Sequence, residues 1–189
     1  MATYSLHTDE LKAAIADLRA GDRVLLSGTV YTSRDAAHRR LFQLLDAGEP
    51  LPYDLTRTVL YYAGPTPAQR GMPVGSCGPT TSGRMDPYTP RLLDLGLVAT
   101  IGKGERSPAV CEAIVRNRSA YFCAVSGAGA LIAGCVKAAE EIAFQDLGCE
   151  SVKRFTVENL PLTCAIDCCG GNLFLQRQGA VPGGSRHVS

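Results

Sequence analysis

The hydrophobic positions of the chain change period repeatedly, from the 3.6-residue period of helices to the two-residue period of strands. Leu11, Ile15 and Leu18 recur at helical spacing after Thr8, the expected N-cap, and Gly21 ends this run. Similar patterns predict further helices over residues 35–46, 88–95, 108–117 and 130–136. Short apolar runs predict strands at residues 24–26, 29–31, 58–63, 98–101, 121–125, 141–144, 152–157 and 162–167.

The order of these elements, in which strands alternate with helices, is typical of an α/β fold with layered sheets and helices. We expect residues 1–176 to form a single layered domain, because no internal repeat and no change of composition marks a second one. Gly170 and Gly171 predict the turn of a closing hairpin after the last strand. Residues 177–189, rich in Gly, Ser and Arg, are expected to form a flexible tail.

Composition narrows the class of protein further. Of the 189 residues, 46% are hydrophobic and 20% are charged, which allows a packed core and excludes disordered, coiled-coil and collagen-like chains. The formal net charge of +1 creates no overall field that would attract nucleic acid or anionic lipid. No apolar run reaches the length of about 18 residues that spans a bilayer, and residues 1–10 lack a secretory leader pattern. We therefore expect a cytoplasmic protein without a nucleic-acid or membrane partner.

The chain contains eight cysteines, and none of them forms a CxxC pair. In a chain without a secretory leader they are expected to be thiols rather than disulfides. Some lie in apolar runs, such as residues 121–125 and 162–166, where cysteine behaves as a small buried hydrophobic residue. We therefore expect no metal site held by this chain alone.

The segment 78–87 concentrates groups that bind anions. It contains two prolines, two glycines, the hydroxyls of Thr80, Thr81 and Ser82, and the guanidinium of Arg84. Backbone N–H groups in such a turn form an anion-binding nest, and an arginine holds a carboxylate through two parallel hydrogen bonds. The alternative is an ordinary turn with a surface arginine. Composition alone favours neither interpretation, although the irregular stretch 64–79, with four prolines and four glycines, is of a length that is often functional.

Two further cations lie where a predicted strand ends. Arg34 precedes Asp35, which is expected to cap the next helix, and a helix N-terminus favours anions. Lys103 lies between two glycines, which let a ligand approach closely. Together with Arg84, these cations suit a small dicarboxylate. His38 is a candidate general acid or base, although a single helical histidine is more often structural. A GxxxxGK[ST] phosphate loop is absent from the sequence.

The sequence Gly-Pro-Thr-Thr-Ser-Gly-Arg-Met-Asp at residues 78–86 resembles the signature of the class I fumarase C-terminal domain. In split enzymes this domain is the β subunit, and L(+)-tartrate dehydratase shares it. Further landmarks follow in the order of that family and extend the resemblance over residues 11–174. They are Ser27-Gly28, Arg34-Asp35-Ala36-Ala37-His38, Gly64-Pro65, Ile101-Gly102-Lys103-Gly104, Gly127-Ala128-Gly129-Ala130 and Leu160-Pro161 before Ala165-Ile166-Asp167.

The resemblance implies a swivelling β/β/α domain and a hydro-lyase that adds water reversibly to fumarate, giving L-malate, as in the tricarboxylic acid cycle. It also implies a [4Fe-4S] cluster whose three cysteines belong to a separate α subunit, so this chain would bind no metal and be active only in a hetero-oligomer with that partner. The alternatives are the β subunit of L(+)-tartrate dehydratase or of mesaconate hydratase. A non-catalytic module that binds dicarboxylates or a protein partner is a further alternative.

The resemblance also implies roles for individual residues. Arg34, Arg84 and Lys103 match the cations that bind the substrate carboxylates, and Thr80 matches the candidate base that removes the C3 proton of malate. A threonine hydroxyl is a weak base unless a neighbouring group activates it, and the resemblance assigns this help to an aspartate of the α part. Thr81 and Ser82 are additional candidates for substrate binding, and His38 is a candidate for a supporting role.

Overall fold

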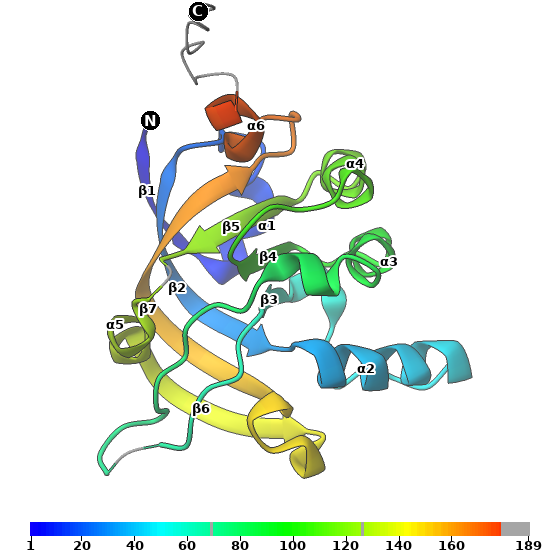
Figure 1. The fold of residues 1–189 in the computed structure, drawn as a ribbon, viewed down its shortest axis with the longest axis vertical. Helices are drawn as coiled ribbons and strands as arrows, with labels where there is room; N and C mark the ends of the chain where they lie inside the picture. Colours follow the sequence, from blue (N-terminus) through cyan, green and yellow to red (C-terminus); the bar gives the residue numbers. More distant parts are fainter. Residues whose placement is uncertain (69, 126, 179–189) are drawn as a thin grey trace, which may run out of the picture.

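The computed structural model describes residues 1–68, 70–125 and 127–178 (Figure 1). Its strands form one sheet in the order β1-β2-β3-β4-β5-β7-β6. The strands are β1 (Thr3–His7), β2 (Arg23–Thr32), β3 (Val59–Tyr61), β4 (Ala99–Gly102), β5 (Ala120–Ala124), β6 (Val136–Ala143) and β7 (Val152–Ile166). The helices are α1 (Thr8–Ala14), α2 (Asp35–Ala47), α3 (Thr89–Asp94), α4 (Pro108–Arg116), α5 (Gly129–Cys135) and α6 (Leu173–Gln178), with short 3-10 helices η1 (Leu55–Arg57), η2 (Ser82–Met85) and η3 (Gln145–Glu150).

The long strand β7 closes the sheet into a ring. It pairs antiparallel with β2 along most of that strand and, through residues 162–166, antiparallel with β5. Between these two, β2, β3, β4 and β5 are successive parallel neighbours. β1 pairs with the first half of β2, and β6 pairs with the first half of β7. The carboxyl ends of β2, β3 and β4 therefore lie side by side at one end of the ring.

Alternate residues of the ring strands face two separate cores, as the two-residue period of a strand requires. Val59, Tyr61 and Phe122 pack inside the ring, whereas Leu60 and Tyr121 pack outside it. Helix α1 contributes Leu11 to the inner core, and α2, α3 and α4 contribute apolar residues to the outer one. These three helices lie together on one side of the ring (Figure 1). The layers of strands and helices confirm the expected α/β class.

The predicted helices are present, although α1 ends at Ala14 instead of near Gly21, and two further details at the N-terminal end differ. Residues 24–26 and 29–31 belong to one strand, β2, which continues through Gly28 at a φ of +111°. The hydroxyl of Thr8 occupies the space that a Cβ at Gly28 would fill. The N-cap of α1 is His7, whose ring accepts a backbone N–H, so Thr8 is the first helical residue instead of the cap. The hydroxyl of Thr8 accepts the N–H of Thr29 (3.0 Å), so its side chain packs against β2.

The C-terminal end differs more from the prediction. Residues 152–157 and 162–167 were expected as two strands, but they form the single strand β7. The expected closing hairpin is present only as a single antiparallel bridge between Ile166 and Asn172, without a second strand. The carboxylate of Asp167 accepts N–H groups from Cys169 and Gly171, which makes a tight turn, and the chain then enters α6. Strand β1 was not predicted, because only one of its edges is paired and its side chains are partly exposed.

The region expected to be a flexible tail begins inside α6, which extends to Gln178. The remainder, residues 179–189, lies outside the described residues. Within the described part of the chain, no helix is both long and apolar enough to cross a membrane.

Candidate functional site

The predicted site residues gather at the carboxyl ends of β2, β3 and β4. Arg34 follows β2 and is the N-cap of α2, and Lys103 follows β4. The loop after β3 returns to the same edge, where Pro79 pairs with Ala63 and Thr81 pairs with Lys103. In α/β sheets with parallel strands, ligands bind preferentially outside the carboxyl ends of the strands. The predicted residues thus lie where this class of fold binds small molecules.

Backbone hydrogen bonds fix the segment that begins at Thr80. The N–H of Thr80 donates to the carbonyl of Tyr62 (N to O, 2.6 Å), and the N–H of Lys103 donates to the carbonyl of Thr80 (3.3 Å). The N–H of Ser82 donates in turn to the carbonyl of Lys103 (2.9 Å). A Cβ at Gly102 would overlap with the hydroxyl of Ser82, so only glycine allows this close approach. The segment is thus held in place on both sides.

The three hydroxyls of this segment meet different surroundings. Ser82 is fully buried; its Oγ accepts the N–H of Lys103 (3.0 Å) and lies 2.9 Å from the phenol oxygen of Tyr121. Thr80 is half-buried and Thr81 is exposed. The hydroxyl of Ser82 therefore connects the segment to the outer core, while Thr80 and Thr81 are the hydroxyl residues with solvent access.

One carboxylate connects the two predicted arginines. Oδ2 of Asp35 lies 2.7 Å from Nη2 of Arg84 and 3.4 Å from Nε of Arg34. Asp35 was expected to cap α2, but the cap position is Arg34 and no side chain caps the helix from there. Instead, Oε2 of Glu150 accepts the N–H of Ala36 (2.7 Å). That expectation is wrong because Glu150, more than a hundred residues away, takes the capping role and leaves Asp35 to the arginines.

Arg34 is also held from its other side. Its Nη2 lies 3.4 Å from Oε1 of Glu150. The absence of a side chain at Gly64 leaves room for it, since a Cβ there would lie 3.0 Å from both Cδ and Nη1 of Arg34. The guanidinium of Arg34 is therefore confined by two carboxylates and one glycine.

A third arginine, which the sequence did not single out, lies beneath the site. The side chain of Arg106 is completely buried, and its Nε donates to Oδ1 of Asp86 (2.7 Å). Its other N–H groups donate to the hydroxyls of Thr89 (2.7 Å) and Thr100 (3.2 Å). Oδ2 of Asp86 accepts the N–H of Ser107 (2.6 Å). This network anchors the end of the motif, and no sequence pattern connects Asp86 with Arg106, twenty positions further along the chain.

His38 lies beneath the same residues, without access to solvent. Its Nδ1 is 2.9 Å from the hydroxyl of Ser33 and 3.2 Å from the carbonyl of Arg34, and its ring packs against those of Tyr62 and Tyr88. Burial lowers the pKa of His38 to about 4, so the ring is neutral at neutral pH. Nε2 has no hydrogen-bond partner. The geometry favours a supporting role for His38 over proton exchange with a ligand.

The cysteines do not assemble into a metal-binding group. Within residues 1–68, 70–125 and 127–178, no three His, Cys, Asp or Glu side chains lie together so that they could hold a metal ion. Burial raises the pKa of the thiols of Cys77 and Cys164 to about 11 and about 12, so both stay protonated. Cys164 is fully buried in the inner core, as expected for a small hydrophobic residue.

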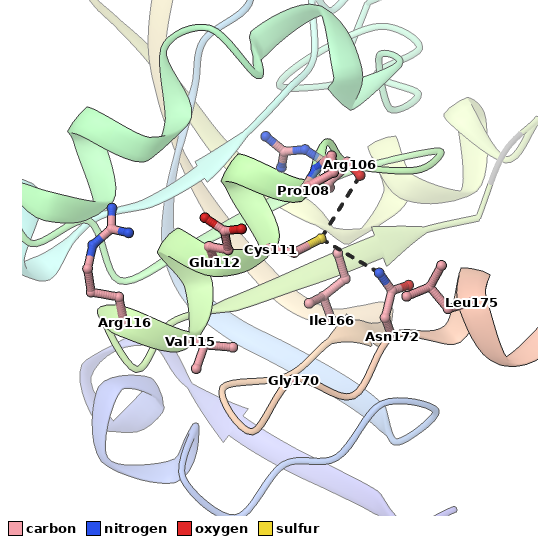
Figure 2. Close-up of a pocket in the computed structure, with 10 residues that line it drawn as sticks. All are labelled: Arg106, Pro108, Cys111, Glu112, Val115, Arg116, Ile166, Gly170, Asn172 and Leu175. Atoms are coloured by element: carbon pink, nitrogen blue, oxygen red, sulfur yellow. Dashed lines mark hydrogen bonds between the residues drawn. The ribbon is translucent and has the colours of Figure 1, made fainter.

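A pocket of about 560 Å³ lies apart from the predicted site, between α4 and the turn that leads to α6 (Figure 2). Cys111, Val115, Ile166 and Leu175 give it an apolar lining. Arg106 borders it, but the guanidinium of this residue is engaged with Asp86. A dicarboxylate would meet few donors there, so we place the candidate site at the strand ends.

Comparison with known proteins gives related sequences over nearly the whole chain. The family described as Fumarase C-terminus matches residues 2–177. Fumarate hydratase 1, mitochondrial, of Leishmania major is 39% identical over 160 residues, which make up 82% of this chain and 28% of that protein. Fumarate hydratase class I, anaerobic, of Escherichia coli (strain K12) is 36% identical over 169 residues, with shares of 88% and 31%.

The L(+)-tartrate dehydratase subunit beta of Escherichia coli (strain K12) is 33% identical over 177 residues, which make up 90% of this chain and 87% of that subunit. The chain thus spans less than a third of the fumarate hydratases that it matches, and nearly all of a separate β subunit.

Proposed function

Because this chain belongs to the fumarase C-terminal family, we propose that it is the β subunit of a two-subunit hydro-lyase that interconverts fumarate and L-malate. The observation that carries the proposal is the gathering of Arg34, Arg84 and Lys103 at the carboxyl ends of three neighbouring parallel strands. A dicarboxylate needs a charge-assisted partner for each carboxylate, and this arrangement supplies cations for both.

The cations contribute to the reaction as well as to binding. Removal of the C3 proton of malate places negative charge on the adjacent carboxylate, and fixed donors stabilise that charge without reorganising. Arg34 is confined by Asp35 and Glu150, and the backbone of Lys103 is hydrogen-bonded to the motif. The guanidinium of Arg34 and the backbone of Lys103 are therefore held at a fixed place before the substrate binds.

Thr80 is the proposed base for the C3 proton. Hydrogen bonds of its N–H and its carbonyl fix the backbone, and its side chain keeps access to solvent. The hydroxyl needs an activating neighbour, which we assign to an aspartate of the partner subunit. Thr81 and Ser82 remain proposed substrate-binding residues, and the buried hydroxyl of Ser82 also positions the backbone of Lys103.

The [4Fe-4S] cluster of the proposed enzyme is assigned to the α subunit. The described residues of this chain do not fit such a group, since they bring no three ligating side chains together. The relative of nearly the same length is named as a β subunit, which supports a separate α partner and a hetero-oligomer. We also assign the ring with its helices to the swivelling β/β/α type, supported by the helix layer on its outer face.

A second candidate function is the dehydration of L(+)-tartrate. It is favoured by the match to a tartrate dehydratase β subunit over 87% of that subunit's length. Tartrate carries one hydroxyl more than malate, so discrimination requires one polar partner for that group. Mesaconate, a methylated fumarate, would require space for a methyl group instead.

The test is anaerobic hydration of fumarate, followed as loss of its absorbance. It compares this chain alone with this chain combined with the cluster-bearing α chain after cluster reconstitution. We expect activity only when both chains are present. Tartrate and mesaconate are then ranked against fumarate by kcat/KM. Activity of the isolated chain would contradict the proposal. A complex with a verified cluster that does not hydrate fumarate would also contradict it. If that complex acted on neither tartrate nor mesaconate either, the remaining alternative would be a non-catalytic module.

A further inference from the structure

Asp35 holds an unusual position for an acidic residue in a site that binds anions. Its carboxylate lies between the guanidiniums of Arg34 and Arg84 and uses one oxygen, Oδ2, for both. An anionic side chain there repels a dicarboxylate substrate, so its presence needs a reason other than attraction of the substrate. The geometry supplies one, because the two arginines come from different elements, the start of α2 and η2.

Two guanidiniums that approach the same oxygen repel one another unless an anion lies between them. Arginine side chains are also long and lose considerable conformational freedom when a ligand orders them. A carboxylate that bridges both opposes the repulsion and restricts the side chains before the ligand arrives. Binding then costs less ordering of the protein, which is the general advantage of a preorganised site.

We propose that Asp35 is a positioning residue that aligns Arg34 and Arg84 for the two carboxylates of the substrate. This inference rests on the proposed function. In it, Asp35 occupies one edge of the Arg84 guanidinium and leaves the other N–H groups for the substrate. The side chain of Arg84 is 51% exposed, which keeps these other N–H groups accessible to a ligand. The side chains of Arg34 and Asp35 are only 24% and 20% exposed.

The surroundings separate this contact from ordinary surface ion pairs. Glu150 connects Arg34 to the N-terminus of α2, so Asp35 and Arg34 are both tied to that helix end. By contrast, the side chain of Asp46 at the other end of α2 is 66% exposed and pairs with that of Arg91, which is 47% exposed (2.6 Å). Exposed pairs of that kind contribute little to stability. Asp46, on the same helix as Asp35 and paired with an arginine of α3, is thus a matched control.

The test uses the assembled enzyme with Asp35→Asn, Asp35→Glu and the control Asp46→Asn. Asparagine keeps the shape of the side chain and removes its charge. We expect Asp35→Asn to raise the KM for fumarate about tenfold, because the substrate must now order the arginines. The effect on kcat is expected to be smaller. Asp35→Glu should restore much of the loss, and Asp46→Asn should leave both constants unchanged.

A second readout follows the contact itself in the folded chain. In ¹⁵N-arginine-labelled protein, rotation of the Arg84 guanidinium is expected to be slow in the wild type and faster in Asp35→Asn. Asp46→Asn should leave it unchanged. The thermal unfolding midpoints of Asp35→Asn and Asp46→Asn should be similar, since a purely structural role for Asp35 would separate them.

The outcomes distinguish the two proposals. If the wild-type complex hydrates fumarate and Asp35→Asn has the same KM and kcat, the positioning role is overturned and the proposed function stands. Faster rotation of Arg84 in Asp35→Asn with unchanged kinetics overturns the positioning role in the same way. If the wild-type complex with a verified cluster acts on no dicarboxylate, the proposed function fails, and the positioning role fails with it.

Discussion

Arg106 and Arg84 both contact an aspartate near η2, but their other N–H groups meet different surroundings. Arg106 is completely buried, and its donors are used by Asp86 and by two threonine hydroxyls. Arg84 is half-exposed, and the ion pair that the described residues give it is with Asp35. A buried arginine whose guanidinium is hydrogen-bonded to protein groups stabilises the loop. An arginine with donors directed to solvent is available to a ligand.

Removal of the buried cation should have the largest effect on stability. We expect Arg106→Ala to lower the free energy of unfolding by about 3–5 kcal/mol, because Asp86 would remain as a poorly solvated charge without its partner. Urea unfolding of the chain measures this. The matched control is Arg116→Ala, which breaks an exposed pair with Asp94 and should cost less than about 1 kcal/mol. Equal losses in the two variants would contradict the distinction.

Removal of the half-exposed cation should affect activity instead of stability. We expect Arg84→Ala to lower turnover of the assembled enzyme by about 100- to 1000-fold, since an electrostatic donor to the substrate carboxylate is lost. Its unfolding midpoint should stay close to that of the wild type. Arg91→Ala, which removes another exposed arginine near α2, serves as the control and should retain full activity. Near-normal turnover of Arg84→Ala would contradict the assignment.

Acid should weaken the buried region through His38. Its pKa is about 4 in the folded chain and about 6.5 in the unfolded chain, so below pH 6.5 the unfolded state binds the additional proton. Stability should therefore fall as the pH falls from 6.5 to 4, by about 3 kcal/mol for this group, and be unaffected by it above pH 6.5. Urea unfolding of the wild type and of His38→Gln across this range tests the expectation. The same pH dependence in both proteins would contradict it.

A smaller effect is expected where the motif packs against β4. In Gly102→Ala the new methyl group overlaps with the hydroxyl of Ser82, so the motif must shift. We expect a loss of about 1–3 kcal/mol in stability, together with a raised KM because Lys103 follows directly. Gly134→Ala is the control, since nothing lies within 4 Å of a Cβ there. A Gly102→Ala variant with wild-type stability and KM would show that the close packing is not required.

The sequence predicted features whose chemistry is local. Helix α2 begins at Asp35, as expected, and Gly48 ends it in the left-handed conformation. Arg34, Arg84 and Lys103 each lie beside a predicted strand end or within a recognisable motif, and the fold brings these elements to one edge of the sheet. Such features depend on residues within a few positions of one another, which is the range over which sequence patterns carry information.

Features that depend on distant residues could not be predicted in this way. The carboxylate of Glu150 reaches the N-terminus of α2, and Arg106 reaches Asp86, although neither pair shares a sequence pattern. The closure of the sheet by β7 was missed for the same reason, since its pairing with β2 joins the two ends of the fold. Asp35 was expected to cap α2 and instead contacts the arginines, because the carboxylate of Glu150 accepts the N–H of Ala36 at that helix end.

The pairing of β7 with β2 has a consequence for co-translational folding on the ribosome. One edge of residues 23–31 pairs with residues 154–163, so the ring cannot close until most of the chain has been synthesised. Such long-range pairing slows folding and leaves strand edges unpaired in the meantime. Arg34, Arg84 and Lys103 are all synthesised well before that point. The site residues are therefore synthesised before β7, the strand that completes the ring.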